Sequence, residues 1–461
     1  MFRVLVVTFL LALMPDLVMA GEADLKLSSD IGLLNLTATH RGLFCVMIFI
    51  IAYIFVMTEE FTHLRKSKPV ILAAGIIWAH VAYLANSHGV AVEQLHAVVT
   101  YNLAEYAELM LFLLVAMTYI NSMAERNVFE RLRSWLVSRR FGYRKLFWIT
   151  GIITFFLSSV ADNLTAALLV GAVVMTVGAK SPRFVSLGFI NLVIAANAGG
   201  AFSPFGDITT LMVWQAGKAQ FFEFFELFIP SVVNYLVPAA FMHFAIPDEV
   251  PESKSDEGLV AMKPGAMIVC GLFALTIAIA VSFKQLLHLP PFMGMMVGLS
   301  LLMFFAYYLR NVEREGEARF DIFSKVADAE WDTLLFFFGV VFAVGGLGYI
   351  GYLELASVAM YDGLGATSAN ILVGVLSAIV DNIPVMFAVL SMGPDMDLYQ
   401  WMLVTLTAGV GGSMLSIGSA AGVALMGTSN GKYTFFSHLK WAPVIALGYI
   451  ASILTHYMVN A

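Results

Sequence analysis

The sequence predicts an all-α polytopic membrane protein made of two inverted-topology repeats, each with a re-entrant hairpin and an interrupted transmembrane helix. Three observations lead to this fold class. Hydrophobic residues make up 60% of the 461 positions and charged residues only 12%, a composition unlike that of soluble globular chains. Apolar runs of about 20 residues, the length that spans a bilayer, recur throughout the chain. Three motifs also recur in the same order in the two halves.

The N-terminus has the composition of a secretory signal. Arg3 precedes an apolar stretch from Val4 to Met14, and Val18-Met19-Ala20 ends in residues small enough for a cleavage site. We expect residues 1–20 to be a signal peptide, and the alternative is an uncleaved first transmembrane helix. In either case residues 21–41 would lie outside the cytoplasm.

The first repeat is predicted to cover residues 42–245 and the second residues 266–461, with a cytoplasmic linker at 246–265. The full-length apolar segments of the first repeat are Gly42–Met57, Val70–Ala85, Leu103–Met123, Phe184–Gly217 and Phe225–Ala245. Those of the second are Ala266–Phe283, Phe292–Leu309, Thr333–Tyr352, Tyr399–Gly427 and Trp441–Val459. Each repeat crosses the membrane an odd number of times, so the second begins on the opposite side from the first.

The positions of the basic residues agree with this threading. Lysine and arginine cluster in the segments predicted to be cytoplasmic, around Arg65, between Arg126 and Lys145, and between Arg310 and Lys325. The segments Asn86–Tyr101 and Leu353–Thr367, which are predicted to be external loops, contain neither residue. Positive charge is therefore on the inside, as the topology requires.

Two further apolar segments, Leu146–Ala179 and Ser368–Met392, carry an Asp-Asn pair near their centres. Basic residues flank the first segment on both sides, and none flanks the second. We expect the first to enter from the cytoplasm and the second from outside. The alternative is one bent helix, but about 34 helical residues would overshoot the hydrocarbon core.

The motifs of the two halves align without gaps inside each motif. "SSVADNLTAALLV" from Ser158 matches "SAIVDNIPVMFAV" from Ser377, and "AEYAELML" matches "AEWDTLLF". The glycine-rich "NAGGAFSPFGDITT" matches "GVGGSMLSIGSAAG", which places Asp207 opposite Ser419. We expect both glycine-rich stretches to interrupt their helices, and the alternative is a packing face of small residues. Inverted repeats with broken helices are typical of secondary transporters that bind substrate at the midplane.

Polar residues converge on these hairpins and breaks. Charged groups within a bilayer are costly and mark ion paths or proton relays, and oxygen donors suit Na⁺ or Li⁺. The candidate cation and proton ligands are Asp162, Asn163, Asp207, Thr209, Thr210, Asp381, Asn382, Ser416 and Ser419, and the supporting residues are Ser158, Ser159, Asn197, Ser203 and Ser377.

The aspartates also suggest a coupling mechanism. Burial disfavours an ionised carboxyl group and a bound cation favours it, so a proton and a cation compete for one site. Asp162 and Asp207 are the first candidates for this exchange, and Asp381 would complete or balance the site. The alternative role for each is a helix-capping aspartate. His80, Glu105 and Glu108 are weaker candidates for a proton relay or pH sensor, because a paired histidine or an interfacial carboxylate needs no function.

The stretches "VADNLTAALL", "NLVIAANAGGAFSPFGDITTLMVWQ", "VDNIPVMFAVL" and "GVGGSMLSIGSAAGVALMG" resemble the NhaD-type sodium/proton antiporters of the ion transporter superfamily. The resemblance runs from about Gly42 to the C-terminus. It implies Na⁺ or Li⁺ efflux in exchange for H⁺ across the bacterial inner membrane, in pH homeostasis and salt tolerance, and it implies a homodimer. One departure is that Ser158-Ser159 stands where the family often has Ser-Pro.

Two other functions fit parts of the sequence. An anion or oxyanion permease of the same superfamily could use helix N-termini as anion sites, although three carboxylates would repel its substrate. An intramembrane aspartyl protease would need two facing aspartates, for which only Asp207 and Asp362 offer a superficial match. His-Glu-x-x-His and phosphate-loop motifs are absent from the sequence. We therefore expect no enzyme, no cofactor and no nucleic-acid partner; the expected partners are Na⁺ or Li⁺, H⁺ and the lipid bilayer.

Overall fold

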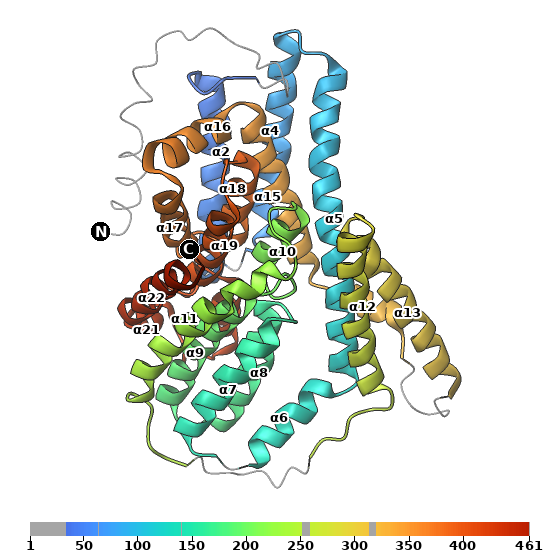
Figure 1. The fold of residues 1–461 in the computed structure, drawn as a ribbon, viewed down its shortest axis with the longest axis vertical. Coiled ribbons are helices and arrows are strands. Elements are labelled where there is room, and N and C mark those ends of the chain that lie inside the picture. Colours follow the sequence, from blue (N-terminus) through green and yellow to red (C-terminus); the bar gives the residue numbers. More distant parts are fainter. Residues whose placement is uncertain (1–33, 63, 140, 251–258, 313–319, 461) are drawn as a thin grey trace. The chain divides into compact units, whose positions relative to one another are not determined.

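The computed structural model describes residues 34–460 apart from 63, 140, 251–258 and 313–319 (Figure 1). Every regular element in this part of the chain is a helix, and nine of the described helices are long and apolar enough to cross a bilayer. The prediction of an all-α polytopic membrane protein is confirmed. The predicted signal peptide lies outside the described residues.

The helices of the first half follow the predicted spans. They are α2 (His40–Met57), α3 (Glu59–Thr62), α4 (Ser67–Ser87), α5 (Val92–Glu125), α6 (Val128–Ser138), α7 (Tyr143–Ser158), α8 (Asn163–Val177), α9 (Pro182–Gly200), α10 (Ile208–Gln215), η1 (Glu223–Leu227) and α11 (Phe228–His243). The span predicted at Phe184–Gly217 is interrupted between α9 and α10, at the glycine-rich stretch that contains Pro204.

The helices of the second half repeat this order in its later part. They are α12 (Ala266–Leu286), α13 (Pro291–Val312), α14 (Ile322–Ala327), α15 (Trp331–Tyr349), α16 (Tyr352–Ser357), η2 (Val358–Asp362), α17 (Ala366–Ser377), α18 (Asn382–Met392), α19 (Leu398–Gly411), α20 (Ala420–Thr428), α21 (Phe435–Leu439) and α22 (Ala442–Asn460). The helix pairs α7–α8 and α17–α18 correspond, as do α9–α10 and α19–α20.

Three segments differ from the sequence prediction. Leu353–Thr367, predicted as an external loop, is mostly helical because α16 and η2 occupy it. The helix α5 begins at Val92, well before the predicted start of its span at Leu103. The helix α6 forms in the basic segment that the sequence predicts to be a cytoplasmic loop. The predicted spans and loops rest on hydropathy and charge. Helix propensity is a separate property, because Glu, Arg and Leu favour helix whether or not the segment lies in the membrane.

Contacts divide the chain into two compact units, and each unit draws on both halves of the sequence. Of the described residues, one unit takes in those up to Glu105 together with Leu335–Ala359, and the other takes in those within Tyr106–Leu334 and those from Met360 onward. In the first unit α2 packs on α4, and Trp78 of α4 donates its indole N–H to the carbonyl of Phe342 on α15 at 2.7 Å.

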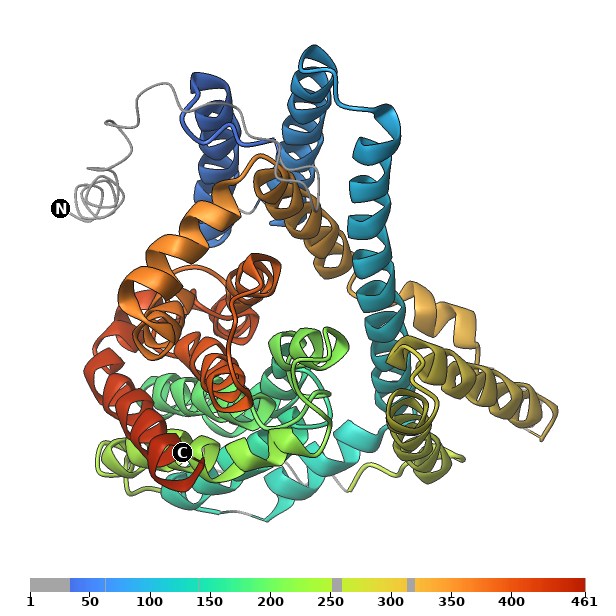
Figure 2. The ribbon, with the colours of Figure 1, turned by 45° about the horizontal axis from the view of Figure 1, so that its top comes forward.

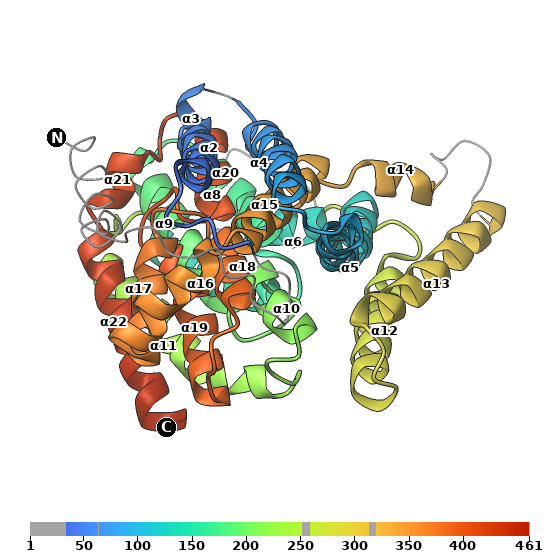
Figure 3. The same cartoon turned by 90° about the horizontal axis from the view of Figure 1, so that it is seen from above.

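The second unit holds both Asp-Asn helix pairs and both interrupted helices. Figure 2 shows α7, α8, α9 and α11 gathered together, and Figure 3 shows α17, α19 and α22 beside them. In the same unit, α12 and α13 pack along each other and bind α5 through Tyr119, whose hydroxyl donates to the carbonyl of Gly298 at 2.7 Å. The most deeply buried of the long apolar helices is α9, so it forms the centre of this unit's core.

Candidate ion-binding site

Each of the three candidate aspartates begins a helix. Asp162 is the N-cap of α8, Asp207 of α10 and Asp381 of α18. In this order, the three side chains accept hydrogen bonds from the backbone N–H groups of Thr165 at 3.0 Å, Thr209 at 3.1 Å and Ile383 at 3.5 Å. A carboxylate at this position satisfies backbone N–H groups and interacts favourably with the helix dipole. All three aspartates therefore cap a helix with one carboxylate oxygen. They differ in the contacts of the side chain beyond this cap.

Asp207 keeps one oxygen for groups outside its own helix. Its Oδ2 accepts from the side-chain amide of Asn163 at 2.6 Å and from that of Asn382 at 2.9 Å. These asparagines begin α8 and α18, one in each half of the chain. Asp207 is 5% exposed, so a single buried carboxylate oxygen joins the two Asp-Asn motifs.

Asp162 and Asp381 differ from Asp207 in both contacts and exposure. Both oxygens of Asp162 are occupied within its own turn, because the hydroxyl of Thr165 also donates to Oδ2 at 2.6 Å. Asp381 lies close enough to Asp207 for their charges to repel each other. Asp162 and Asp381 are partly exposed, whereas Asp207 is buried.

A hydrogen-bond network fixes the asparagines around Asp207. The hydroxyl of Ser158 donates to Asn163 Oδ1 at 2.7 Å, which leaves the amide N–H₂ of Asn163 to face Asp207. Asn197 accepts a weaker bond from Asn163 at 3.4 Å and donates to the hydroxyl of Ser419 at 3.1 Å. The network therefore runs from the first Asp-Asn pair to the break in the second half.

The hydroxyl groups at the two helix breaks differ in their hydrogen bonding. The hydroxyl of Thr210 donates to the backbone carbonyls of Ser203 at 2.8 Å and Asp207 at 2.7 Å, so it links two positions of the first break. The Ser416 hydroxyl is buried and has no hydrogen-bond partner among the described residues. A buried hydroxyl oxygen without a protein partner can serve as a ligand for a hard cation, since such ions bind oxygen atoms.

The two halves build the same backbone frame. Ser158 donates to the carbonyl of Ala196 at 2.8 Å, and Ser377 donates to that of Ala408 at 2.7 Å. A Cβ added to Gly206 would lie 2.6 Å from the carbonyl oxygen of Ser158, and one added to Gly418 would lie 2.7 Å from that of Ser377. Glycine is required at both places because hairpin and break touch backbone to backbone.

The remaining candidates lie apart from this network. Ser159 donates to the carbonyl of Phe156 within its own helix. His80 packs its ring on Phe44, with 5.0 Å between centroids, and Glu105 accepts a hydrogen bond from Tyr101.

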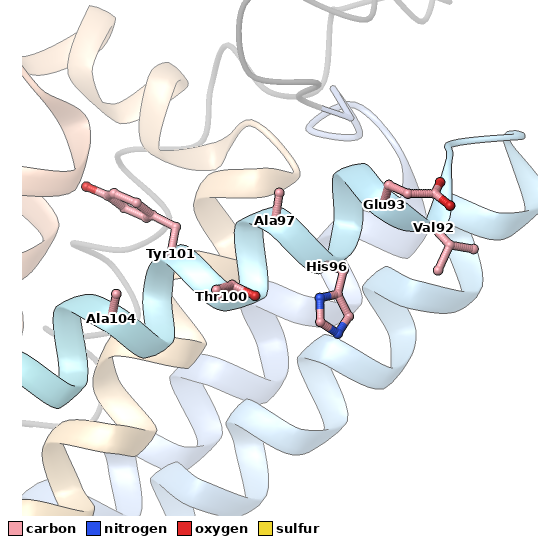
Figure 4. Close-up of a pocket in the computed structure, with 7 residues that line it drawn as sticks. All are labelled: Val92, Glu93, His96, Ala97, Thr100, Tyr101 and Ala104. Carbon is pink, nitrogen blue, oxygen red and sulfur yellow. The ribbon is translucent and has the colours of Figure 1, made fainter.

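His80 and Glu105 belong to the first unit, whereas Glu108 is on the part of α5 that belongs to the second. A pocket of about 720 Å³ lies along α5. Figure 4 shows the side chains that line it, none of which is a candidate residue: Val92, Glu93, His96, Ala97, Thr100, Tyr101 and Ala104. Among the described residues, no three His, Cys, Asp or Glu side chains gather as a metal-binding group.

Sequence reasoning missed several residues that shape the site. Thr165 closes the Asp162 cap, and its spacing three residues after the aspartate is a capping signal that the sequence does contain. The carbonyls of Ala196 and Ala408 receive the hairpin serines, and only the fold could place them. His438, which contacts the second break, and Tyr433, which bonds His438, carry no motif that marks them.

Comparison with known proteins gives the same family as the motifs. The chain is 55% identical to the Na(+)/H(+) antiporter NhaD of Alkalimonas amylolytica, over 93% of this chain and 92% of that protein. It is 53% identical to the NhaD of Vibrio cholerae, over 96% of this chain and 97% of that protein. The chain belongs to the NhaD family of antiporters.

More distant relatives extend this assignment. Sodium/proton antiporter 1 of Arabidopsis thaliana is 32% identical over 92% of this chain and 73% of that protein. The family model that matches residues 53–409 is described as a citrate transporter. The relatives are named as transporters, so the protein is a multi-pass membrane transporter and not an enzyme. The aspartyl protease alternative is therefore excluded.

Proposed function

We propose that this protein exchanges Na⁺ or Li⁺ for H⁺ across the bacterial inner membrane, with Asp207 as the carboxylate for which the cation and the proton compete. The observation that carries the proposal is the buried Oδ2 of Asp207, held by Asn163 and Asn382. Among the described residues, no lysine or arginine forms an ion pair with it, so its compensating charge must be a proton or a bound cation.

The surrounding oxygens supply a coordination shell for that cation. Asp381 is the second nearby carboxylate, and two anionic groups side by side are stable together only with positive charge between them. Ser416 adds a hydroxyl without a protein partner. Thr209 and Ser419 add hydroxyls at the starts of α10 and α20. We propose that these oxygens bind the dehydrated ion, and that Asn163 and Asn382, whose amide groups donate to Asp207 Oδ2, hold the carboxylate in place.

Exchange follows from competition at this single site. When the cation binds, the charge on the carboxylate is compensated and the proton leaves; when the site is emptied toward the other side, a proton replaces the cation. We propose that the two halves form inverted repeats, and that this arrangement exposes the site to each side of the membrane in turn. The matching Ser158 and Ser377 contacts support the repeat.

Everted membrane vesicles test the proposal. With a pH gradient imposed at alkaline pH, added Na⁺ or Li⁺ should dissipate the gradient in vesicles that contain this protein and not in vesicles that lack it. Asp207→Asn, which keeps the size and the capping oxygen of the side chain, should remove the response. If neither cation dissipates the gradient with the wild-type protein, the proposed exchange is wrong.

The match to a citrate transporter model favours a second candidate, transport of a carboxylate anion. Such a substrate would have to approach Asp207 and Asp381, and both would repel it. Uptake of radiolabelled citrate by the same vesicles separates the two candidates. Citrate uptake without cation-dependent proton movement would establish the anion permease in place of the antiporter.

A further inference from the structure

The second break is held by a buried histidine outside the network around Asp207. His438 lies on α21, the short helix next to α22 in the chain (Figure 1). Its Nε2 is 2.9 Å from the carbonyl oxygen of Ser413, and its Nδ1 is 2.7 Å from the hydroxyl of Tyr433. His438 and Tyr433 are 0% and 1% exposed.

These contacts define what the ring can do. Ser413 follows the last residues of α19, where carbonyl groups lose their helical partners and require another donor. A neutral imidazole that accepts from the Tyr433 hydroxyl at Nδ1 carries its proton on Nε2 and donates it to Ser413. Tyr433 is itself held, because its ring packs on Phe189 of α9 with 5.8 Å between centroids. The donor therefore has a fixed position.

Ser413 belongs to the same interrupted segment as two candidate ligands. Ser416 follows three residues later, and Ser419 ends the segment with its hydroxyl bonded to Asn197. The backbone of Ser416 is tightly confined, since a Cβ on Gly422 would overlap its carbonyl oxygen. Fixing the Ser413 carbonyl anchors the start of a segment whose end is anchored by Asn197.

In the first half, the position that corresponds to His438 does not hold a buried histidine. The alignment that pairs Asp207 with Ser419 also pairs η1 (Glu223–Leu227) with α21 (Phe435–Leu439), residue for residue. It places Glu226 opposite His438 and Phe221 opposite Tyr433. Glu226 is exposed, and Phe221 packs on Trp214 and Phe205. The histidine therefore belongs to the second break alone.

We propose that His438 is a positioning residue for cation binding: as a neutral donor to the Ser413 carbonyl, it keeps the Ser416 and Ser419 oxygens in place to bind the ion. This inference rests on the proposed function, because it assigns those oxygens to the cation site. His438 touches neither the cation nor Asp207, so its removal changes the affinity for the cation more than the rate of exchange at saturation.

Three full-length variants test the inference. His438→Leu removes both hydrogen bonds, whereas His438→Gln retains one donor and one acceptor on a neutral side chain. His456→Leu is the matched control, because His456 is also buried and bonds the carbonyl of Tyr399 at 3.2 Å, at the start of α19 and away from the break. The apparent KM for Na⁺ and the maximal rate per folded protein are measured in everted vesicles.

The expected result separates affinity from rate. His438→Leu should raise the apparent KM for Na⁺ about tenfold, the effect of one unsatisfied buried carbonyl, with little change in the maximal rate. His438→Gln should restore most of the affinity, and His456→Leu should leave KM unchanged. An unchanged KM in His438→Leu, an equal rise in His456→Leu, or no rescue by glutamine would each overturn the inference.

Two further measurements keep the test independent of folding and of exchange. If His438→Leu is not recovered as a monodisperse protein, Tyr433→Phe takes its place, since it removes only the hydroxyl that orients the ring; an unchanged KM in that variant contradicts the inference. Calorimetry of Na⁺ binding to purified wild type and variants reads affinity without transport. Absent exchange in the wild type would reject the proposed function, whereas equal Na⁺ affinity in wild type and His438→Leu would reject the positioning role.

Discussion

The two helix breaks share one backbone frame and differ in chemistry. Both follow a Gly-Gly pair, both end at the N-cap of a short helix, and both contact a hairpin serine through a glycine. The first ends in Asp207, and the second ends in Ser419. The first is surrounded by aromatic rings, whereas the second is bonded to His438.

This difference shows how two breaks with similar backbone contacts can differ in charge. An aspartate in place of Ser419 would add a further negative charge to the network that joins Asn197, Asn163 and Asp207, and it would repel the carboxylate of Asp207. The hydroxyl of Ser419 ends the second break without adding charge. The backbone contacts are therefore shared, whereas a carboxylate ends the first break alone.

The largest expected effect comes from substituting the residue that ends each break, one variant at a time. Asp207→Asn should abolish cation-dependent proton movement, because the amide cannot release a proton and keeps the shape of the cap. Ser419→Ala at the corresponding position should only weaken cation affinity, since it removes a neutral oxygen that Asn197 already shares. Fluorescence dequenching in everted vesicles measures both, and equal losses in the two variants would contradict the asymmetry.

A smaller loss is expected for Asp162→Asn. Both oxygens of Asp162 are bonded to Thr165, and asparagine is as good an N-cap as aspartate. We expect this variant to fold normally and to keep part of its exchange activity, unlike Asp207→Asn. Vesicle assays on the two variants at matched protein levels make the comparison. Complete loss in Asp162→Asn would show that its charge takes part directly in exchange.

The extent to which sequence could predict this site differs between its charged and uncharged parts. Intramembrane carboxylates and glycine-rich breaks are costly, so they stand out from an apolar background. The sequence proposes Asp207 as a candidate on this ground, and Asn163 and Asn382 because each follows an aspartate. The sequence could not rank the three aspartates, because an aspartate that only caps its own helix looks the same in sequence as one that also contacts the other half of the chain. Only the fold shows that Thr165 occupies Asp162 while Asp207 faces the opposite half.

The helical fold was predicted well where hydropathy determines it and less well at segment ends. The interruptions at Pro204 and at the second glycine-rich stretch are where the sequence places them. The helix at α16 was missed, because its residues were assigned by the absence of positive charge rather than by helix propensity. His438 was missed because a buried histidine on a short helix has no periodic or motif signature, and its partner Ser413 is 25 residues away.

The glycine contacts provide a test of the shared frame by protein stability. Gly206→Ala and Gly418→Ala each place a methyl group against a backbone carbonyl at 2.6 and 2.7 Å, and backbone cannot yield as a side chain can. We expect each to cost about 1–3 kcal/mol of stability. Gly427→Ala is the control, because nothing lies within 4 Å of its added Cβ and alanine favours helix over glycine. Thermal unfolding in detergent should rank the three variants in this way.

The smallest expected difference is between the two hairpin serines. Ser158 donates to the Ala196 carbonyl and also to Oδ1 of Asn163, whereas among the described residues Ser377 donates to the Ala408 carbonyl alone. Removing either hydroxyl should cost about 1 kcal/mol of stability. Only Ser158→Ala should also weaken Na⁺ affinity, because Asn163 is then free to turn away from Asp207. Calorimetric Na⁺ titrations of the two variants, compared at equal thermal stability, measure this directly; equal affinities would mean that the Ser158 hydroxyl supports the backbone and not the ion site.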